Sequence, residues 1–368
     1  MPRLTKLAVT AASLAAVAGV AFAATTASGA TSAPLNYVGM GDSYSAASGN
    51  VPPDPSAAPQ CLRSTVNYPH LIAATTGAKL TDVTCGGAQT KDYFSSQYQG
   101  LAPQLDALSS KTQLITMTIG GNDSNVFIDS IVECGVAGAT TAGQGSPCKD
   151  RYGSSFDNTI NHTTYPSLVK TLQAVHAKAP HARVAILGYL QILPKSGGCY
   201  PQMPVASGDV PYLDDIQATL NSAVKRAAAA TGTTYVDATK ISQGHDACQA
   251  EGVRYVEPVI GGTNPVIVHP TALGESTLAQ LTITTLHLHC RGGGPARRRA
   301  DVLTCCNGGM RETCSVCGRQ ADPQVDGDPP LAWSAEPIGD AEGTRWVCAQ
   351  CTREHVRAIE AKLDPHWW

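Results

Sequence analysis

The chain has 368 residues, of which 43% are hydrophobic and 5% aromatic, and it carries a formal net charge of −3 at pH 7. This length suffices for one large or two ordinary domains with a substantial core. The weak net charge offers no electrostatic basis for binding nucleic acid or an anionic membrane surface, and so few aromatic residues argue against recognition of stacked bases.

The first residues have the pattern of an export signal. Arg3 and Lys6 provide positive charge, an apolar run extends from Leu7 to Phe22, and Ala23 closes a small-residue cleavage site. The alternative is a membrane anchor, but the run is shorter than the ~20 apolar residues that a spanning helix needs. We therefore predict a signal peptide over residues 1–23, with residue 30 as a rival cleavage position, and a spacer over 24–34. The mature protein is expected to be secreted and extracellular, with no stable membrane anchor.

Short apolar runs alternate with helical patterns over residues 35–290. Five strands are expected, at 35–40, 79–84, 113–119, 183–187 and 234–236. Helices are expected at 165–178, 211–230 and 271–288, and long polar loops at 51–60, 135–152 and 190–210. This alternation predicts a three-layer α/β/α fold, in which helices cover both faces of a parallel sheet.

Three of these strands end at glycines that bring a polar group to the end of the strand. The first glycine stop is followed by Ser43, the second contains Gly87, and the third is followed by Asn122. In an open α/β sheet, ligands bind at this edge. A hydroxyl, a backbone N–H and a side-chain amide meeting there would place a nucleophile beside an oxyanion hole. Because a serine hydroxyl needs a neighbouring base, His269, just before the last helix, is the candidate general base.

Other interpretations of the glycine and asparagine remain open at this point. Gly86 and Gly87 would also suit a plain turn that requires positive φ. Asn122 would also suit a turn stabilised by its own side chain.

Four segments resemble, in the same order, the sequence blocks of GDSL/SGNH esterases and lipases. They are GDSYSAASG, CGGAQT, IGGNDS and VHPTALGE, and they span Gly41 to Glu275. Each is weak alone, whereas the ordered set is specific. The resemblance, which is greatest to secreted actinobacterial esterases and lipases, implies a flavodoxin-like SGNH hydrolase domain over residues 35–290 that cleaves carboxylic esters.

The resemblance also implies roles for the motif residues. It makes Ser43 the nucleophile, and its backbone N–H joins Gly87 and Asn122 in the oxyanion hole. Gly87 is preferred to Gly86 because it lies two positions after the cysteine of its block.

Two aspartates beside these motifs are expected to be structural. Asp42 would brace the nucleophile turn, and Asp123 would cap the helix that follows it.

The acid that usually orients the histidine of this family is missing. The wider family places an aspartate three residues before the histidine, and here that position is Val266. No Asp or Glu occurs between Gly261 and His269. Since a backbone carbonyl can accept the Nδ1–H bond instead, we predict a Ser43–His269 dyad oriented by the carbonyl of Val266. The rival is a triad that uses Asp237.

The 13 cysteines fall into two groups and a remainder. Six are scattered through the hydrolase region, and the sequence alone does not choose among their fifteen pairings. The family resemblance favours Cys61–Cys85, Cys134–Cys148 and Cys199–Cys248. No role is assigned to Cys290, Cys305 and Cys306.

The C-terminal part has a different character. After a Gly/Pro-rich, basic linker at 291–304, residues 305–368 contain two C-x-x-C pairs, Cys314/Cys317 and Cys348/Cys351. This spacing is typical of a structural Cys₄ zinc site, whereas export favours two disulfides instead. The segment resembles small actinobacterial zinc-ribbon-like proteins. A thiolate zinc site is out of place in a secreted esterase, so a fusion of two neighbouring reading frames is our preferred hypothesis, and a genuine two-domain protein is the alternative.

The sequence therefore predicts a monomeric serine hydrolase that cleaves a small-molecule or lipid ester through an acyl-enzyme on Ser43, with no cofactor for catalysis. Zinc is expected only in the tail, and nucleic acid is not an expected partner. The alternative is a non-catalytic binding or regulatory protein that keeps the fold.

Overall fold

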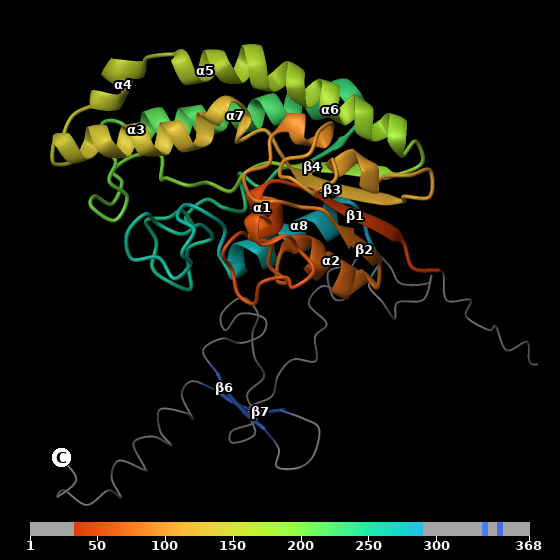
Figure 1. Cartoon of the computed structure of the whole chain (residues 1–368). Helices are drawn as coiled ribbons and strands as arrows, with labels where there is room; N and C mark the ends of the chain where they lie inside the picture. Colours follow the sequence, from red (N-terminus) through yellow and green to blue (C-terminus); the bar gives the residue numbers. More distant parts are fainter. Residues whose placement is uncertain (1–32, 290–332, 338–343, 349–368) are drawn as a thin grey trace, which may run out of the picture. The chain divides into compact units, whose positions relative to one another are not determined.

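A computed structural model describes residues 33–289, 333–337 and 344–348. Within the first range, five strands form one parallel sheet in the order β2-β1-β3-β4-β5 (Figure 1). The strands are β1 (Asn36–Gly41), β2 (Lys79–Asp82), β3 (Leu114–Thr118), β4 (Arg183–Leu187) and β5 (Thr234–Val236). All five lie where the sequence predicts them, so the α/β prediction is confirmed.

Helices cover both faces of this sheet. They are α1 (Ser43–Ala46), α2 (Tyr68–Thr76), α3 (Val126–Thr140), α4 (Pro147–Tyr152), α5 (Ser155–Thr159), α6 (Tyr165–Lys178), α7 (Val210–Thr231) and α8 (Ala272–Thr285). Figure 1 shows α6 and α7 on one side of the sheet and α2 and α8 on the other. Within each pair the two helices pack against each other. The result is the three-layer arrangement expected from the alternation of strands and helices.

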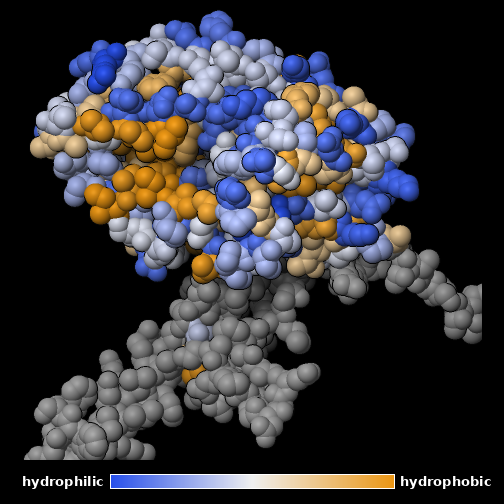
Figure 2. Space-filling view, viewed as in Figure 1, coloured by the Kyte–Doolittle hydropathy of each residue, from blue (hydrophilic) through white to orange (hydrophobic). Residues whose placement is uncertain are grey.

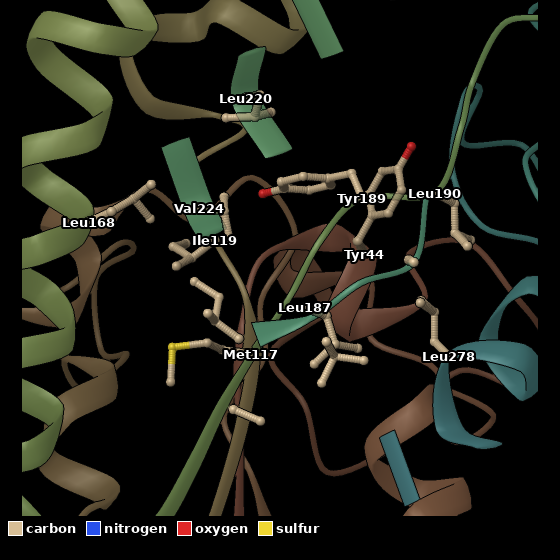
Figure 3. Packing of buried hydrophobic residues seen from close by; sticks show 14 of the residues in the cluster. Tyr44, Met117, Ile119, Leu168, Leu187, Tyr189, Leu190, Leu220, Val224 and Leu278 are labelled. Atoms are coloured by element: carbon tan, nitrogen blue, oxygen red, sulfur yellow. The ribbon is translucent and has the colours of Figure 1, made fainter. Parts of the chain in front are cut away.

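The core lies between the sheet and these helices. Figure 3 shows Met117 of β3 and Leu187 of β4 between Leu168 and Val224 on one side and Leu278 of α8 on the other. All five side chains are buried. Every residue of β3 is buried, as expected for a parallel strand that has helices on both faces. Its two threonines, Thr116 and Thr118, form hydrogen bonds within the core.

The expected loop at 135–152 is largely helical, so that prediction was wrong. Helix α3 continues to Thr140 and α4 covers Pro147–Tyr152. The second half of α3 contains Gly135 and Gly138, which disfavour a helix, so this part of the sequence resembles a loop.

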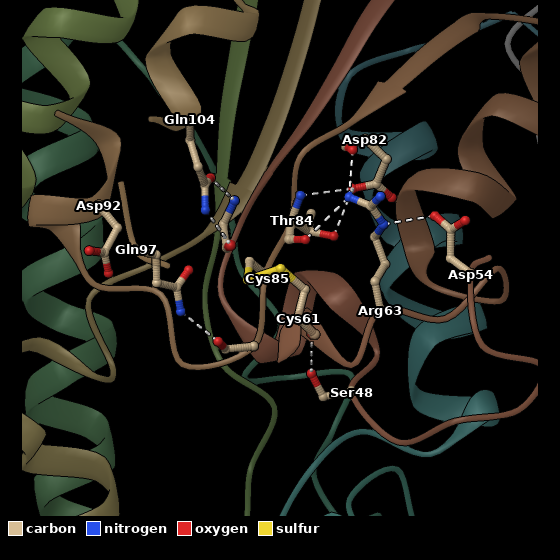
Figure 4. The surroundings of a disulfide bond; sticks show 12 residues. Ser48, Asp54, Cys61, Arg63, Asp82, Thr84, Cys85, Asp92, Gln97 and Gln104 are labelled. Atoms are coloured by element: carbon tan, nitrogen blue, oxygen red, sulfur yellow. Dashed lines mark hydrogen bonds and ion pairs between the residues drawn. A yellow bond between two sulfur atoms is a disulfide. The ribbon is translucent and has the colours of Figure 1, made fainter. Parts of the chain in front are cut away.

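Three disulfide bonds are present in the described hydrolase region: Cys61–Cys85, Cys134–Cys148 and Cys199–Cys248. They are the pairs that the family resemblance implied. Figure 4 shows the first of them beside Arg63, which forms ion pairs with Asp54 at 2.8 Å and Asp82 at 3.4 Å. This disulfide and the buried ion pairs connect the segment that follows α1 to the end of β2.

Several predictions fall outside the described residues. The signal peptide, nearly all of the spacer and the linker at 291–304 are among them, so the proposed domain boundaries remain predictions. Within 305–368 the structure describes an antiparallel hairpin of β6 (Ser334–Pro337) and β7 (Thr344–Val347). Of the predicted zinc ligands, Cys314, Cys317 and Cys351 lie outside the described ranges. None of the helices within those ranges is long and apolar enough to cross a bilayer.

Candidate active site

Ser43 lies at a sharp turn between β1 and α1. Gly41 ends the strand with φ +119°, and a Cβ there would lie 2.3 Å from the carbonyl oxygen of Thr118, so only glycine fits. Asp42 then caps α1 by accepting from the N–H of Tyr44 at 3.0 Å. Ser43 is the first residue of the helix, and its own N–H has no acceptor within the described residues. This N–H is therefore available to a ligand.

Asp42 connects this turn to the neighbouring strands, as expected for a bracing residue. Its Oδ1 accepts from the Thr118 hydroxyl at 2.7 Å and its Oδ2 from the Tyr189 hydroxyl at 2.5 Å. The Tyr189 oxygen in turn accepts from the N–H of Gly121 at 2.8 Å. Burial raises the pKa of Asp42 to about 6, although these hydrogen bonds favour its charged form and oppose the shift. The carboxylate thus ties together the ends of β1 and β3 and the residues that follow β4.

The glycine turn after β2 presents one backbone donor. The N–H of Gly86 donates to the carbonyl of Cys61 at 2.8 Å, so it is already paired. Gly87, with φ +73°, has an N–H without an acceptor among the described residues. Gln97 holds the turn by donating to the carbonyl of Gly86 at 2.7 Å (Figure 4). This hydrogen bonding favours Gly87 over Gly86 as a donor to a ligand.

Asn122 follows β3 and contacts the same turn. Its Nδ2 donates to the carbonyl of Ala88 at 3.1 Å. A side-chain amide has two hydrogens, so the second one remains for a ligand.

Asp123 does not cap the next helix, and that expectation was wrong. Its carboxylate accepts from the N–H of Thr90 at 2.8 Å and from the hydroxyl of Thr90 at 2.7 Å. A 3₁₀ turn over Asp123–Asn125 separates it from α3, and Ser124 and Asn125 have φ values of +52° and +60°. The chain therefore changes direction before the helix begins, and Asp123 anchors the segment after the Gly87 turn.

His269 lies in the loop between β5 and α8, and a backbone carbonyl orients its ring. Nδ1 lies 2.7 Å from the carbonyl oxygen of Ile267, not from that of Val266 as predicted. The reason is Val268, whose φ of +57° reverses the chain and returns the Ile267 carbonyl to the ring. Since a carbonyl only accepts, Nδ1 carries the hydrogen and the neutral ring keeps its lone pair on Nε2.

Asp237 does not contact His269. It is exposed, its carboxylate accepts from the N–H of Thr239 at 3.0 Å, and it lines a polar cleft together with Lys195 and Lys225. Within residues 33–289, no carboxylate hydrogen-bonds the His269 ring. Burial lowers the pKa of His269, while the bond to Ile267 opposes the shift, so the imidazole is held in its neutral form.

Tyr44 joins the serine turn to the histidine loop. Its hydroxyl donates to the carbonyl of Val268 at 2.8 Å, and its ring centroid lies 5.4 Å from that of His269. Ser43 and His269 are both buried beside it. No hydrogen bond joins the Ser43 hydroxyl to His269 in the described chain, and such catalytic bonds often form only with substrate present.

Glu257, an acid for which no role was predicted from the sequence, stabilises the loop that carries His269. Its backbone N–H donates to the carbonyl of His269 at 2.9 Å, and it accepts from Val268 at 3.1 Å. Its buried carboxylate pairs with Arg254 at 2.8 Å and accepts from the Thr263 hydroxyl at 2.5 Å. Both carboxylate oxygens of Glu257 therefore interact with residues other than His269. Glu257 stabilises the backbone of the loop, and the carbonyl of Ile267 orients the imidazole ring.

An apolar pocket with a cavity volume of about 60 Å³, partly open to solvent, adjoins these residues. Its lining includes Phe127, whose ring centroid lies 6.1 Å from that of His269. It also includes Tyr189, whose ring centroid lies 5.1 Å from that of Tyr44 (Figure 3). The remaining lining residues are nearly all aliphatic; most come from α3, from 192–205 and from α7, and Ile160 and Val259 complete the set. Sequence reasoning missed this pocket, because its walls come from segments that pair only in three dimensions.

Comparison with known proteins agrees with this geometry. The profile of the GDSL-like Lipase/Acylhydrolase family matches residues 40–276. Lipase 2 of Streptomyces coelicolor is 57% identical over 256 residues, which cover 69% of this chain and 86% of the relative. A lipase of Streptomyces rimosus is 34% identical over 259 residues, which cover 68% of this chain and 87% of the relative.

Solved structures show the same fold. Phospholipase A1 from Streptomyces albidoflavus NA297 matches with a TM-score of 0.57 at 30% identity, covering 69% of this chain and 99% of that one. The extracellular lipase from Streptomyces rimosus matches with a TM-score of 0.58 at 28% identity, covering 68% and 99%. Together with the motif positions, these matches show that the chain belongs to the GDSL-like lipase/acylhydrolase family.

Proposed function

We propose that this protein hydrolyses carboxylic esters through an acyl-enzyme on Ser43. The Ser43 Oγ attacks the ester carbonyl carbon while Nε2 of His269 takes its proton. The alcohol then leaves with that proton, and the acyl group stays on Oγ. A water molecule, deprotonated by the same nitrogen, attacks the acyl-enzyme, and the carboxylic acid and free serine are released. These steps need only protein groups and water, so no cofactor is invoked.

One observation carries this proposal. The N–H groups of Ser43 and Gly87 and one amide hydrogen of Asn122 have no acceptor among the described residues, and they follow three strands that are neighbours in the sheet. Donors left unpaired at one edge of a sheet are suited to an oxyanion, whose charge develops only in the transition state. The buried, neutral imidazole of His269 completes the set of groups that acyl transfer requires.

The apolar pocket supports an acyl group with a hydrocarbon chain. Phe127 and Tyr189 line it and also contact His269 and Tyr44, so a chain bound there would begin beside the proposed nucleophile. The relatives are named lipases and a phospholipase A1. We infer that the substrates are esters of aliphatic acids, including lipids, and that the protein acts as a monomer outside the cell.

Turnover of p-nitrophenyl esters of increasing acyl length tests this function. We expect hydrolysis by the wild type and a loss on the order of 10³-fold or more in kcat for Ser43→Ala. Unchanged activity in Ser43→Ala would exclude the mechanism, and no hydrolysis of any ester would favour the alternative of a non-catalytic binding protein.

A second variant tests the pocket separately. Leu213 lines it on α7, and Leu213→Trp should fill it and shift the preference towards shorter acyl chains. An unchanged chain-length preference would place the acyl group elsewhere.

The tail requires its own test. We keep as a proposal that Cys314, Cys317, Cys348 and Cys351 hold one zinc ion. Intact mass and metal content of the native secreted protein decide this. A full-length species with one zinc supports it, and a species that ends near residues 290–300 supports the fused reading frame.

A further inference from the structure

The outer face of α3 carries an unusual set of exposed aliphatic side chains. Ile128, Val132 and Val136 follow one another at intervals of four residues, and their exposed fractions are 45%, 47% and 57%. Residues four apart lie above one another on a helix, so the three form one stripe. Gly135 and Ala139 lie on the same face, and the exposed Asp129 lies at its edge. We call Ile128, Val132 and Val136 the α3 stripe.

This stripe adjoins the mouth of the apolar pocket. Val126, Phe127, Ser130 and Ile131 of the same helix line the pocket, so one helix presents apolar groups both inward and outward. Pro204, which also lines the pocket, lies 3.6 Å from the position of a Cβ on Gly135. Figure 2 shows apolar surface gathered where Figure 1 draws α3, with a hollow within it. The apolar surface is therefore continuous from the outside of the helix into the pocket.

The charges of α3 restrict what this surface can bind. The helix contains Asp129 and Glu133 but no lysine or arginine. Anionic lipids and nucleic acids attract basic side chains. α3 offers none, and in α4, which packs against it, Lys149 and Arg151 are accompanied by Asp150. A neutral or zwitterionic lipid surface, in contrast, needs only apolar side chains that enter its outer layer. An acyl chain drawn from such a surface would reach the pocket without crossing water.

We propose that the α3 stripe docks the enzyme on the surface of aggregated, electrically neutral lipid ester. This inference extends the proposed function, because it names the physical state of the substrate and the surface that meets it. Exposed aliphatic side chains beside the pocket favour binding through the burial of apolar area. The dissolved short esters used above do not need this contact.

Binding to phosphatidylcholine vesicles tests the proposal in the absence of turnover. In a Ser43→Ala background, the full chain should sediment with the vesicles. The triple variant Ile128→Ser/Val132→Ser/Val136→Ser should bind roughly tenfold more weakly or worse, because three aliphatic side chains no longer enter the lipid. Val136→Asp should weaken binding by itself. A control variant, Leu62→Ser/Ile241→Ser, removes side chains that are 51% and 44% exposed on other segments and should bind like the parent.

The same substitutions are then introduced into the active enzyme, which retains Ser43. Their effect on hydrolysis of dissolved p-nitrophenyl acetate separates this inference from the proposed function. Turnover of the dissolved ester should match the wild type, which also shows that the variants fold, while hydrolysis of emulsified triacylglycerol falls. Equal vesicle binding by the triple variant and its parent would overturn the docking proposal and leave the esterase intact. A vesicle-free dimer that the triple variant dissociates would overturn it as well, because the stripe would then bind a second copy of this chain.

Discussion

The hydroxyl of Tyr44 donates a 2.8 Å hydrogen bond to the carbonyl of Val268. Tyr44, which follows the proposed nucleophile, is thus hydrogen-bonded to Val268, which precedes the proposed base. Val268 has φ +57°, a costly conformation for a β-branched side chain, and this conformation brings the Ile267 carbonyl to His269. The neighbour of Ser43 therefore helps to maintain the geometry of the imidazole.

Tyr44→Phe should lower kcat by about tenfold with little change in KM, because a small misplacement of a catalytic group is costly to rate. It should also destabilise the protein by about 1–2 kcal/mol, since the buried carbonyl of Val268 loses its donor. Steady-state kinetics and urea unfolding measure the two effects. Tyr37→Phe is the matched control: it removes a buried hydroxyl that bonds to Thr116 within the sheet. Its stability should fall similarly and its kcat should not change, so an equal fall in kcat for both variants would contradict a positioning role for Tyr44.

Asp237→Asn should leave kcat within about twofold of the wild type, because the carbonyl of Ile267 and not this carboxylate orients His269. Loss of a triad aspartate costs on the order of 10⁴ in kcat. Comparison of kcat for Asp237→Asn and His269→Ala decides between dyad and triad. A loss of that size in Asp237→Asn would mean that the loop rearranges to form a triad.

Asn122→Ala should reduce kcat by about 10²–10³-fold with KM nearly unchanged, as expected for an oxyanion donor that acts mainly in the transition state. Asn158→Ala, on an exposed face of α5, is the control and should have wild-type kinetics. If KM rises while kcat holds, Asn122 binds the ground state and is not an oxyanion donor.

The acid limb of kcat/KM should lie below the ordinary histidine pKa of ~6.5. Nε2 of His269 accepts a proton only when the ring is neutral, so the rate falls as pH falls through the pKa. Burial lowers that pKa, so the enzyme should keep its activity to a lower pH than an exposed histidine would allow. A pH profile with a dissolved ester measures this. A limb above 6.5 would show that a nearby negative charge, and not burial, controls the imidazole.

The stability of Glu275→Gln relative to the wild type should increase as pH rises. Glu275 is fully buried in α8, accepts from the N–H of Tyr68 at 2.7 Å, and its Oε1 has no partner among the described residues. Burial, and then the charges of Asp42 and Asp82, raise its pKa well above the ordinary value. The folded state therefore holds a proton that the unfolded state releases, and wild-type stability falls once pH exceeds the unfolded pKa of ~4.3.

Urea unfolding at pH 5 and pH 8 measures this difference. The stability advantage of Glu275→Gln should be larger at pH 8, whereas Glu251→Gln, at an exposed glutamate, should show no such trend. An advantage that is the same at both pH values would mean that Glu275 ionises normally in the folded state.

The sequence predicted the sheet well because its strands are short and three of them end at glycines, and both features are local. Ser43, Gly87 and Asn122 were identifiable for the same reason: each lies in or directly after such a glycine stop. The orienting carbonyl was misplaced by one residue because a valine with positive φ leaves no mark in the sequence. The second half of α3 was missed because Gly135 and Gly138 disfavour a helix in the sequence. Tyr44 was missed because its role depends on Val268, a residue 224 positions away.

The central claim is that Ser43 forms an acyl-enzyme. Mass spectrometry of the enzyme, quenched during turnover of a p-nitrophenyl ester and then digested, tests it most directly. We predict an added mass equal to the acyl group on the peptide that contains Ser43, and its absence in Ser43→Ala. An acyl adduct on another residue, or the same turnover by Ser43→Ala without any adduct, would contradict the proposed mechanism.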